Sequence, residues 1–204
     1  MKERITMKRL RLGVLASGGG TNLQSIIDRS AAGKLDADVV VIISNNSRSG
    51  ALKRARKHGI DAYHISTLTE GSDDALDRAL SQKLMDYNVD LVILAGYMKK
   101  IGPVLIESFP GRILNIHPAL LPRFGGRDMY GIRVHQAVLD AGVTESGVTV
   151  HIVDSQYDHG SILEQRKVPV LENDTPEELA ARVLVEEHKI YADVIQRLAE
   201  EWEE

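Results

Sequence analysis

Short apolar runs alternate with amphipathic stretches along the first half of the chain. The apolar runs are bounded by Gly, Asn or Asp, which is typical of buried strands. They cover Leu10 to Ala16, Asp38 to Ser44, Asp61 to Ile65, Leu91 to Ala95 and Arg112 to Ile116. Helix-compatible segments lie between them, at Asn22 to Ala32, Gly50 to Lys57, Ser72 to Tyr87 and Pro103 to Glu107. This alternation predicts βαβ units, and therefore a parallel sheet with helices on both faces.

The pattern changes after Asn115. A loop rich in Pro and Gly runs to Gly131, and a helix is predicted from there to about Ala141. Two further apolar runs are close enough in sequence to pair antiparallel, at Val148 to Val153 and Ser161 to Val168. No repeat, low-complexity tract or linker divides the sequence. We therefore expect residues 1–204 to form one three-layer, Rossmann-like α/β domain with a mixed, mostly parallel sheet.

The last predicted helix has a clear start. Thr175 can cap it, Pro176 suits the first helical position, and Glu178 stands where a capping-box carboxylate belongs. Its apolar stripe consists of Leu179, Val183, Ile190, Val194 and Leu198. Glu187 projects along this stripe and not onto the solvated face. From the periodicity alone, a boundary residue whose carboxylate reaches water is the simpler interpretation, and a ligand contact is the alternative.

Composition narrows the function classes. The 204 residues are 43% hydrophobic, and 25 Lys and Arg against 29 Asp and Glu give a net charge of -4. Nothing in this balance indicates a nucleic acid or a membrane as partner, so small molecules are favoured. The chain has no Cys, which excludes disulfides and thiolate sites. Met1 to Lys8 is polar and basic and does not read as a signal segment, so we expect a cytoplasmic protein.

A glycine-rich loop, Ser17 to Asn22, follows the first strand and opens the first helix. The backbone N–H groups of this loop can face an anion there, assisted by the helix dipole. Leu23 occupies the place of the third glycine of a dinucleotide motif, and no Gly-Lys-Ser/Thr follows. The loop therefore favours a monophosphate, with a purely geometric turn as the alternative.

Two polar residues end the fifth predicted strand. Alternation places Asn115 and His117 on one side and Ile116 on the other. Ligands of parallel sheets bind beyond the carboxyl ends of strands, which is also where the glycine loop lies. An amide beside an imidazole can stabilise an oxyanion that forms on a carbonyl under attack. The alternative is a histidine that merely caps the strand end.

Asp158, between the last two predicted strands, is the third candidate, because a carboxylate beside His117 favours imidazolium and can accept a proton. In isolation its Asp-His-Gly segment is an ordinary turn. The other histidines are predicted to have structural roles only. We expect surface or strand-edge positions for His58 and His64, and partly buried packing positions for His151 and His188. No pair of histidines has the spacing of a helical zinc motif, so no metal site is expected.

Five segments together carry a resemblance to a known family: Leu15 to Gln24, Leu94 to Met98, Asn115 to Pro122, Gly147 to His151 and Glu187 to Tyr191. They resemble the phosphoribosylglycinamide formyltransferases, folate-dependent enzymes of purine synthesis with the formyltransferase fold. The resemblance implies that the amine of glycinamide ribonucleotide attacks the formyl carbon of the co-substrate 10-formyltetrahydrofolate. It covers nearly the whole chain, from about Arg11 to Leu198.

By position, the resemblance also implies residue roles. Asn115 matches an oxyanion-stabilising amide, His117 the acid, and Asp158 the carboxylate that tunes this histidine. The phosphate-binding turn corresponds to Gly20, Thr21 and Asn22. The carboxylate that holds the ribose hydroxyls corresponds to Glu187. The segment that lines the pterin pocket corresponds to Met98, Lys99, Lys100 and Ile101, together with the loop before Asp158. Relatives often carry an arginine near the folate tail, in the loop before the third long helix, where this sequence has Asp73. Lys99 also stands at a position where arginine is frequent.

The main alternative is a formyltetrahydrofolate deformylase, in which water replaces the amine. Pro118 argues against it, because the deformylase family typically has a His directly after the catalytic His. The absence of an amino-terminal regulatory domain also argues against it, because that family typically has a longer chain. A transfer-RNA formyltransferase would need a basic carboxy-terminal domain. A non-catalytic nucleotide-binding module would keep the glycine loop and lose the polar trio. The expected partners are the two small-molecule substrates, and a homodimer stays open.

Overall fold

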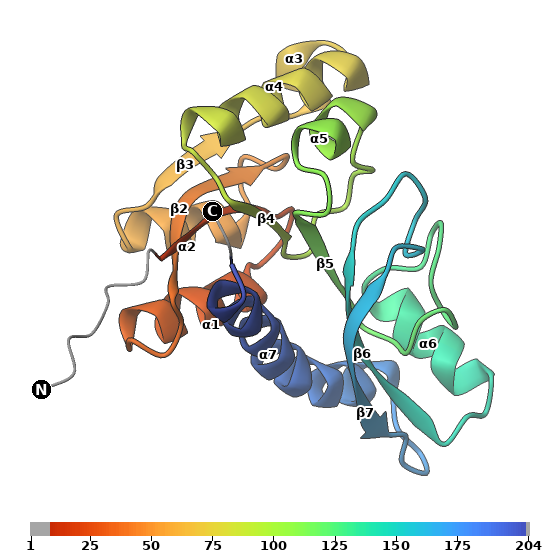
Figure 1. Ribbon diagram of the computed structural model, residues 1–204. Coiled ribbons are helices and arrows are strands. Elements are labelled where there is room, and N and C mark those ends of the chain that lie inside the picture. Colours follow the sequence, from red (N-terminus) through yellow and green to blue (C-terminus); the bar gives the residue numbers. More distant parts are fainter. Residues whose placement is uncertain (1–8, 203–204) are drawn as a thin grey trace, which may run out of the picture.

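The computed structural model describes residues 9–202, in which seven strands form one sheet in the order β3-β2-β1-β4-β5-β6-β7 (Figure 1). The first five strands run parallel: β1 (Leu10–Leu15), β2 (Ala37–Ser44), β3 (Asp61–His64), β4 (Leu91–Leu94) and β5 (Ile113–His117). Two more pair antiparallel, β6 (Glu145–Ile152) and β7 (Ile162–Pro169). The predicted mixed, mostly parallel sheet is confirmed, whereas the interpretation of Met1 to Lys8 lies outside the described residues.

Helices cover both faces of the sheet, as predicted (Figure 1). The core on one face includes side chains from α1 (Thr21–Ala31), α2 (Gly50–Lys57), α6 (Ile132–Asp140) and α7 (Pro176–Glu200). The other face is covered by α4 (Asp73–Asp86) and α5 (Pro103–Ser108), with the short α3 (Thr67–Glu70) beside α4. Because α3 has only four residues, no periodicity in the sequence could predict it.

Strand alternation divides the apolar core between the two faces. Leu114 and Ile116 pack into the core on the α7 side, and Ile113 packs into the core on the α4 side. Asn115 and His117 therefore point away from the α7 core, as the sequence predicted. Two polar side chains are thus held at a strand end by the burial of their apolar neighbours.

The long helix α7 is anchored at its start and across the sheet. The Thr175 hydroxyl accepts the backbone N–H of Glu178, whose carboxylate in turn accepts the Thr175 N–H at 2.8 Å, which confirms the predicted capping box. Further along, the hydroxyl of Tyr191 lies 3.0 Å from the carbonyl oxygens of both Leu94 and Leu114. These contacts fix α7 against β4 and β5, the two strands that end at the cavity described below.

Two sequence predictions need correction. Strand β6 begins at Glu145 and not at Val148, because its polar first residues pair with β7 through the backbone, which apolar patterning does not reveal. Asp73 lies not in a loop but in the first turn of α4, where Ser72 is the N-cap. Within residues 9–202, no helix is both long and apolar enough to cross a membrane.

Candidate active site

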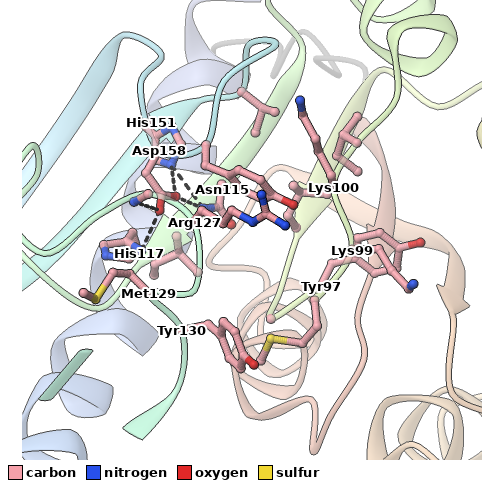
Figure 2. A pocket seen from close by; sticks show the side chains of 18 of the residues that line it. Tyr97, Lys99, Lys100, Asn115, His117, Arg127, Met129, Tyr130, His151 and Asp158 are labelled. Atoms are coloured by element: carbon pink, nitrogen blue, oxygen red, sulfur yellow. Dashed lines mark hydrogen bonds and ion pairs between the residues drawn. The ribbon is translucent and has the colours of Figure 1, made fainter. Parts of the chain in front are cut away.

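A cavity of about 1090 Å³ lies at the carboxyl ends of the parallel strands. Side chains line it from the segment after β4, the end of β5, the loop after β5 and the β6–β7 loop (Figure 2). The start of α1 and helix α7 also contribute lining residues. This is the edge at which open α/β sheets bind ligands. Its size suits a pair of small substrates better than a single short one.

The three predicted reaction-centre residues meet in this cavity (Figure 2). His117 Nδ1 lies 3.5 Å from Asp158 Oδ2, and Asn115 Nδ2 lies 3.4 Å from Asp158 Oδ1. Only 3% of His117 is exposed, so its contacts with the carboxylate are poorly screened by water. The structure brings the trio together, including Asp158, whose position the strand pattern alone could not give.

The loop after β5 is bonded to this trio. The Phe124 carbonyl oxygen lies 2.8 Å from His117 Nε2 and can accept its hydrogen, and Gly126 donates its N–H to Asp158 Oδ2 at 2.9 Å. His117 Nε2 is thus occupied by the backbone, and Nδ1 is the ring nitrogen that can exchange a proton beside Asp158.

Burial and charge set the protonation of this pair. Burial lowers the pKa of His117, and the opposing influence of Asp158 and of the Phe124 carbonyl does not restore it. For Asp158, burial acts to raise the pKa, but contacts with His151, His117 and the Gly126 N–H outweigh it, and the pKa is lowered. A proton on His117 is therefore donated readily, while Asp158 stays ionised near neutral pH.

His151 belongs to the same cluster, although the sequence suggested only packing for it. The side chain is 2% exposed, and its Nε2 lies 3.1 Å from Asn115 Nδ2 and 3.5 Å from Asp158 Oδ1. Its Nδ1 lies 2.9 Å from the carbonyl oxygen of Ile152, which can accept the ring N–H. That leaves Nε2 free to accept from the Asn115 amide. The packing interpretation was therefore wrong.

The glycine loop and Glu187 meet at one end of the cavity. Asn22 Nδ2 donates to Glu187 Oε2 at 2.7 Å, and the buried Asn22 side-chain oxygen has no partner within residues 9–202. Burial raises the pKa of Glu187, which the Asn22 bond only partly opposes. Both side chains line the cavity, whereas Gly20 and Thr21 lie beside them outside its lining. The ligand-contact interpretation of Glu187 is thus favoured over a carboxylate that reaches open water.

The segment after β4 forms another wall. Met98, Lys99, Lys100 and Ile101 all line the cavity, with Ile101 buried and the other three exposed. The Met98 N–H donates to Ser17 Oγ at 2.8 Å, which ties this wall to the glycine loop. Residues 154–157, which precede Asp158, also line the cavity, as the sequence indicated.

Comparison with known proteins agrees with this geometry. The family model described as formyl transferase matches residues 10–195. The chain belongs to the formyl transferase family. It is 47% identical, over 95% of its length and 67% of the relative's, to a chloroplastic phosphoribosylglycinamide formyltransferase of Arabidopsis thaliana.

Solved structures of formyl transferases give the same picture. The crystal structure of glycinamide ribonucleotide transformylase 1 from Symbiobacterium toebii matches with a TM-score of 0.90 and 45% identity, over 95% of this chain and 89% of that one. A formyltetrahydrofolate deformylase from Pseudomonas syringae matches less well, with a TM-score of 0.84, 26% identity, and coverage of 95% and 62%. The comparisons therefore favour the transferase over the hydrolase.

Two more side chains of this formyl transferase line the cavity without having been predicted. The Tyr97 hydroxyl and His135 Nδ1 are buried and have no hydrogen-bond partner among the residues that the structure describes. Burial raises the pKa of Tyr97 to about 12 and lowers that of His135 to about 4. A tyrosine after a strand and a histidine in a helix carry no sequence signal of such positions. Within residues 9–202, no group of three or more His, Cys, Asp or Glu is placed to hold a metal ion.

Proposed function

We propose that this formyl transferase moves the formyl group of 10-formyltetrahydrofolate to the amine of N1-(5-phosphoribosyl)glycinamide, a step of de novo purine biosynthesis. The observation that carries the proposal is the convergence of Asn115, His117 and Asp158 in one cavity, which the Asn22–Glu187 pair and the Met98–Ile101 wall also line. An amine substrate and a formyl donor need such an arrangement, with proton-transfer groups between two binding regions.

The chemistry follows from the atoms at the centre of the cavity. The amine nitrogen bonds to the formyl carbon, and the carbonyl oxygen gains negative charge in the tetrahedral intermediate. Asn115 Nδ2 contacts His151 at 3.1 Å and Asp158 at the longer distance of 3.4 Å. The hydrogen of the longer contact can turn to this oxygen when substrate is bound, and protonated His117 can donate its Nδ1–H to the same oxygen. The bond between the formyl carbon and N10 then breaks.

Proton balance assigns a role to the carboxylate. The attacking amine loses a proton, and N10 of the departing tetrahydrofolate gains one. Asp158 is ionised and contacts His117, so it can accept the proton from the amine, directly or through a water, and pass it towards N10. The net result is formylated amine and tetrahydrofolate, with the side chains returned to their starting protonation.

The two binding regions match the two substrates. The turn before α1 offers backbone N–H groups to the phosphate, and the carboxylate of Glu187 can accept hydrogen bonds from ribose hydroxyls. Asn22, whose side-chain oxygen lacks a partner, can accept another hydrogen bond. On the other side, the wall of Met98 and Ile101 provides apolar area for the pterin ring.

The test is whether formyl loss depends on the amine. Purified protein is mixed with 10-formyltetrahydrofolate, with and without glycinamide ribonucleotide, and the tetrahydrofolate formed is followed by absorbance. We expect rapid turnover only when the amine is present. Equal consumption without the amine would move the assignment to a deformylase, and no turnover in either mixture would support a non-catalytic module.

A further inference from the structure

The turn between β1 and α1 is held from one side through its carbonyl groups. Those of residues 17–19 each accept one hydrogen bond, and the donors are, in that order, Asn46 Nδ2 at 3.3 Å, the Ala51 N–H at 3.2 Å and Arg54 Nε at 2.9 Å. All three donors lie in the segment that connects β2 to α2 or in α2 itself. The carbonyl groups of the turn therefore point towards α2.

The amide groups of this turn point the other way. In a trans peptide unit, the C=O of one residue and the N–H of the next point in opposite directions. The Gly20 N–H is therefore directed away from α2, because Arg54 holds the Gly19 carbonyl of the same peptide unit. Gly20 is left-handed, with φ of +73°, and Thr21 begins the right-handed α1, a succession that gathers N–H groups into an anion-binding concavity. Among the residues that the structure describes, no N–H group of residues 18–22 donates a hydrogen bond.

Only the first N–H group of this concavity depends on Arg54. Helix α1 directs the next one, because the Gly20 carbonyl accepts the Gln24 N–H at 3.0 Å as part of the helix. The Gly19–Gly20 peptide unit lies before the helix, between two residues without side chains, and has wide rotational freedom unless it is anchored. Arg54 Nη1 also donates to Gln24 Oε1 at 2.9 Å, so the guanidinium bridges α2, the turn and α1.

We propose that Arg54 is a positioning residue for phosphate recognition, which holds the Gly19–Gly20 peptide unit so that the Gly20 N–H donates to the phosphate of the amine substrate. This inference rests on the function proposed above. The guanidinium binds the carbonyl side of the turn, opposite to the N–H groups, and so acts through the peptide unit and not on the phosphate. Without it the peptide unit can turn over, and a carbonyl oxygen then replaces an N–H donor beside the anion.

The experiment compares kcat/KM for glycinamide ribonucleotide with kcat/KM for its phosphate-free counterpart, N1-ribosylglycinamide, expressed as a ratio. Arg54→Met removes the donors and keeps an apolar stem. We expect it to lower the ratio about tenfold, the range of one hydrogen bond to a charged group, through a higher KM for the phosphorylated amine. The kcat and the KM for the folate should stay within about twofold of wild type, because the lost contact serves binding alone.

Matched variants separate positioning from charge. Arg56→Met removes the same charge from α2, but Arg56 is exposed and projects from another side of the helix, so the ratio should keep its wild-type value. Arg54→Lys retains the charge without the planar fork of donors and should recover less than about half of the loss. The inference is overturned if Arg54→Met lowers kcat/KM for both amines alike, if Arg56→Met has the same effect, or if Arg54→Lys restores the wild-type ratio.

A binding measurement distinguishes this inference from the proposed function. Calorimetric titration with ribose 5-phosphate requires neither folate nor turnover, and Arg54→Met should weaken its binding about tenfold while Arg56→Met leaves it unchanged. If this loss is found but glycinamide ribonucleotide is not formylated, the proposed function fails and the role of Arg54 stands. If formyl transfer occurs and Arg54→Met keeps the wild-type ratio and affinity, only the role of Arg54 is refuted.

Discussion

Asp158 is the residue at which the proposed reaction centre is assembled. Its Oδ2 faces His117 and accepts the Gly126 N–H, and its Oδ1 faces both His151 and Asn115. The backbone of Asp158 has φ of +53°, in the left-handed region that aspartate tolerates better than most residues. Such conformations are often found at functional sites, where surrounding contacts hold them. One carboxylate thus orders three side chains from two neighbouring strands.

His151 is expected to act as a positioning residue for Asn115. His151→Leu removes the acceptor for one amide hydrogen of Asn115, so the amide can rotate away from the formyl oxygen. We expect kcat to fall about ten- to a hundredfold with little change in KM for either substrate, because small misplacements of reacting groups are costly. Steady-state kinetics with both substrates measure this split.

The conservative variant tests whether the effect is positional. His151→Gln retains a side-chain oxygen that can accept from Asn115, and should recover much of the lost kcat. His117→Ala, which removes the proton donor itself, should lose roughly a hundredfold or more in kcat. A His151→Leu variant with wild-type kcat would contradict the positioning role.

How far the site could be predicted from the sequence differs from residue to residue. Asn115 and His117 were placed by strand alternation and by the rule that ligands lie beyond strand ends. Asp158 depended on the family resemblance, because a turn residue has no periodicity to locate it. His151 was missed because its role follows from the antiparallel register, which pairs it directly with Asn115. A register that pairs residues 36 positions apart is a tertiary fact, and no local pattern encodes it.

At the scale of elements, the turn between β1 and α1 depends on close backbone packing. Gly20 has φ of +73°, and a Cβ there would lie 2.9 Å from Ala51 Cα in α2. A neighbouring glycine shows the same crowding from the other side, since a Cβ on Gly50 would lie 2.5 Å from the Gly19 carbonyl oxygen. The turn proposed to bind phosphate and the start of α2 are therefore one packed unit, and glycine is needed in both.

Gly20→Ala tests this unit. The left-handed backbone alone should cost about 1–2 kcal/mol of unfolding free energy, and the contact with Ala51 adds to it. Because the turn must shift, KM for glycinamide ribonucleotide should rise while KM for the folate changes less. Gly33→Ala is the matched control: its φ is +66°, but no atom lies within 4 Å of the added Cβ. Equal KM values in the two variants would refute a role of the turn in phosphate binding.

Element boundaries were predictable where local chemistry marks them. The limits of α2 and the capping box of α7 were read directly from the sequence, because caps and helix periodicity are local. The four-residue α3 and the polar start of β6 were not predicted. A Ser66 cap defines the start of α3, and backbone pairing with β7 defines the start of β6. Helix α3, which the sequence pattern did not predict, also contributes Thr67 and Leu68 to the lining of a second, smaller cavity.

At the scale of the whole molecule, the fold lowers the pKa of several buried or partly buried histidines. Burial lowers the pKa of His117, His135 and His188, and neighbouring histidines add to this for the first two. His135 and His117 line the same cavity, so a proton on one disfavours a proton on the other. Acid therefore destabilises the native protein through the site that carries its chemistry.

This arrangement predicts how stability depends on pH. His135 has a pKa of about 4 in the folded protein and 6.5 as the reference value, so the unfolded chain binds more protons between these values. Stability is therefore full above pH 6.5 and falls as pH drops towards 4, with His135 contributing a loss of about 2 kcal/mol by pH 5. Urea unfolding at pH 7.5, 6 and 5 measures the decline. The His135→Phe variant has no imidazole to protonate at this position and should lose correspondingly less stability over this pH range. If its stability falls with pH in parallel with that of wild type, the burial of His135 does not determine the acid sensitivity.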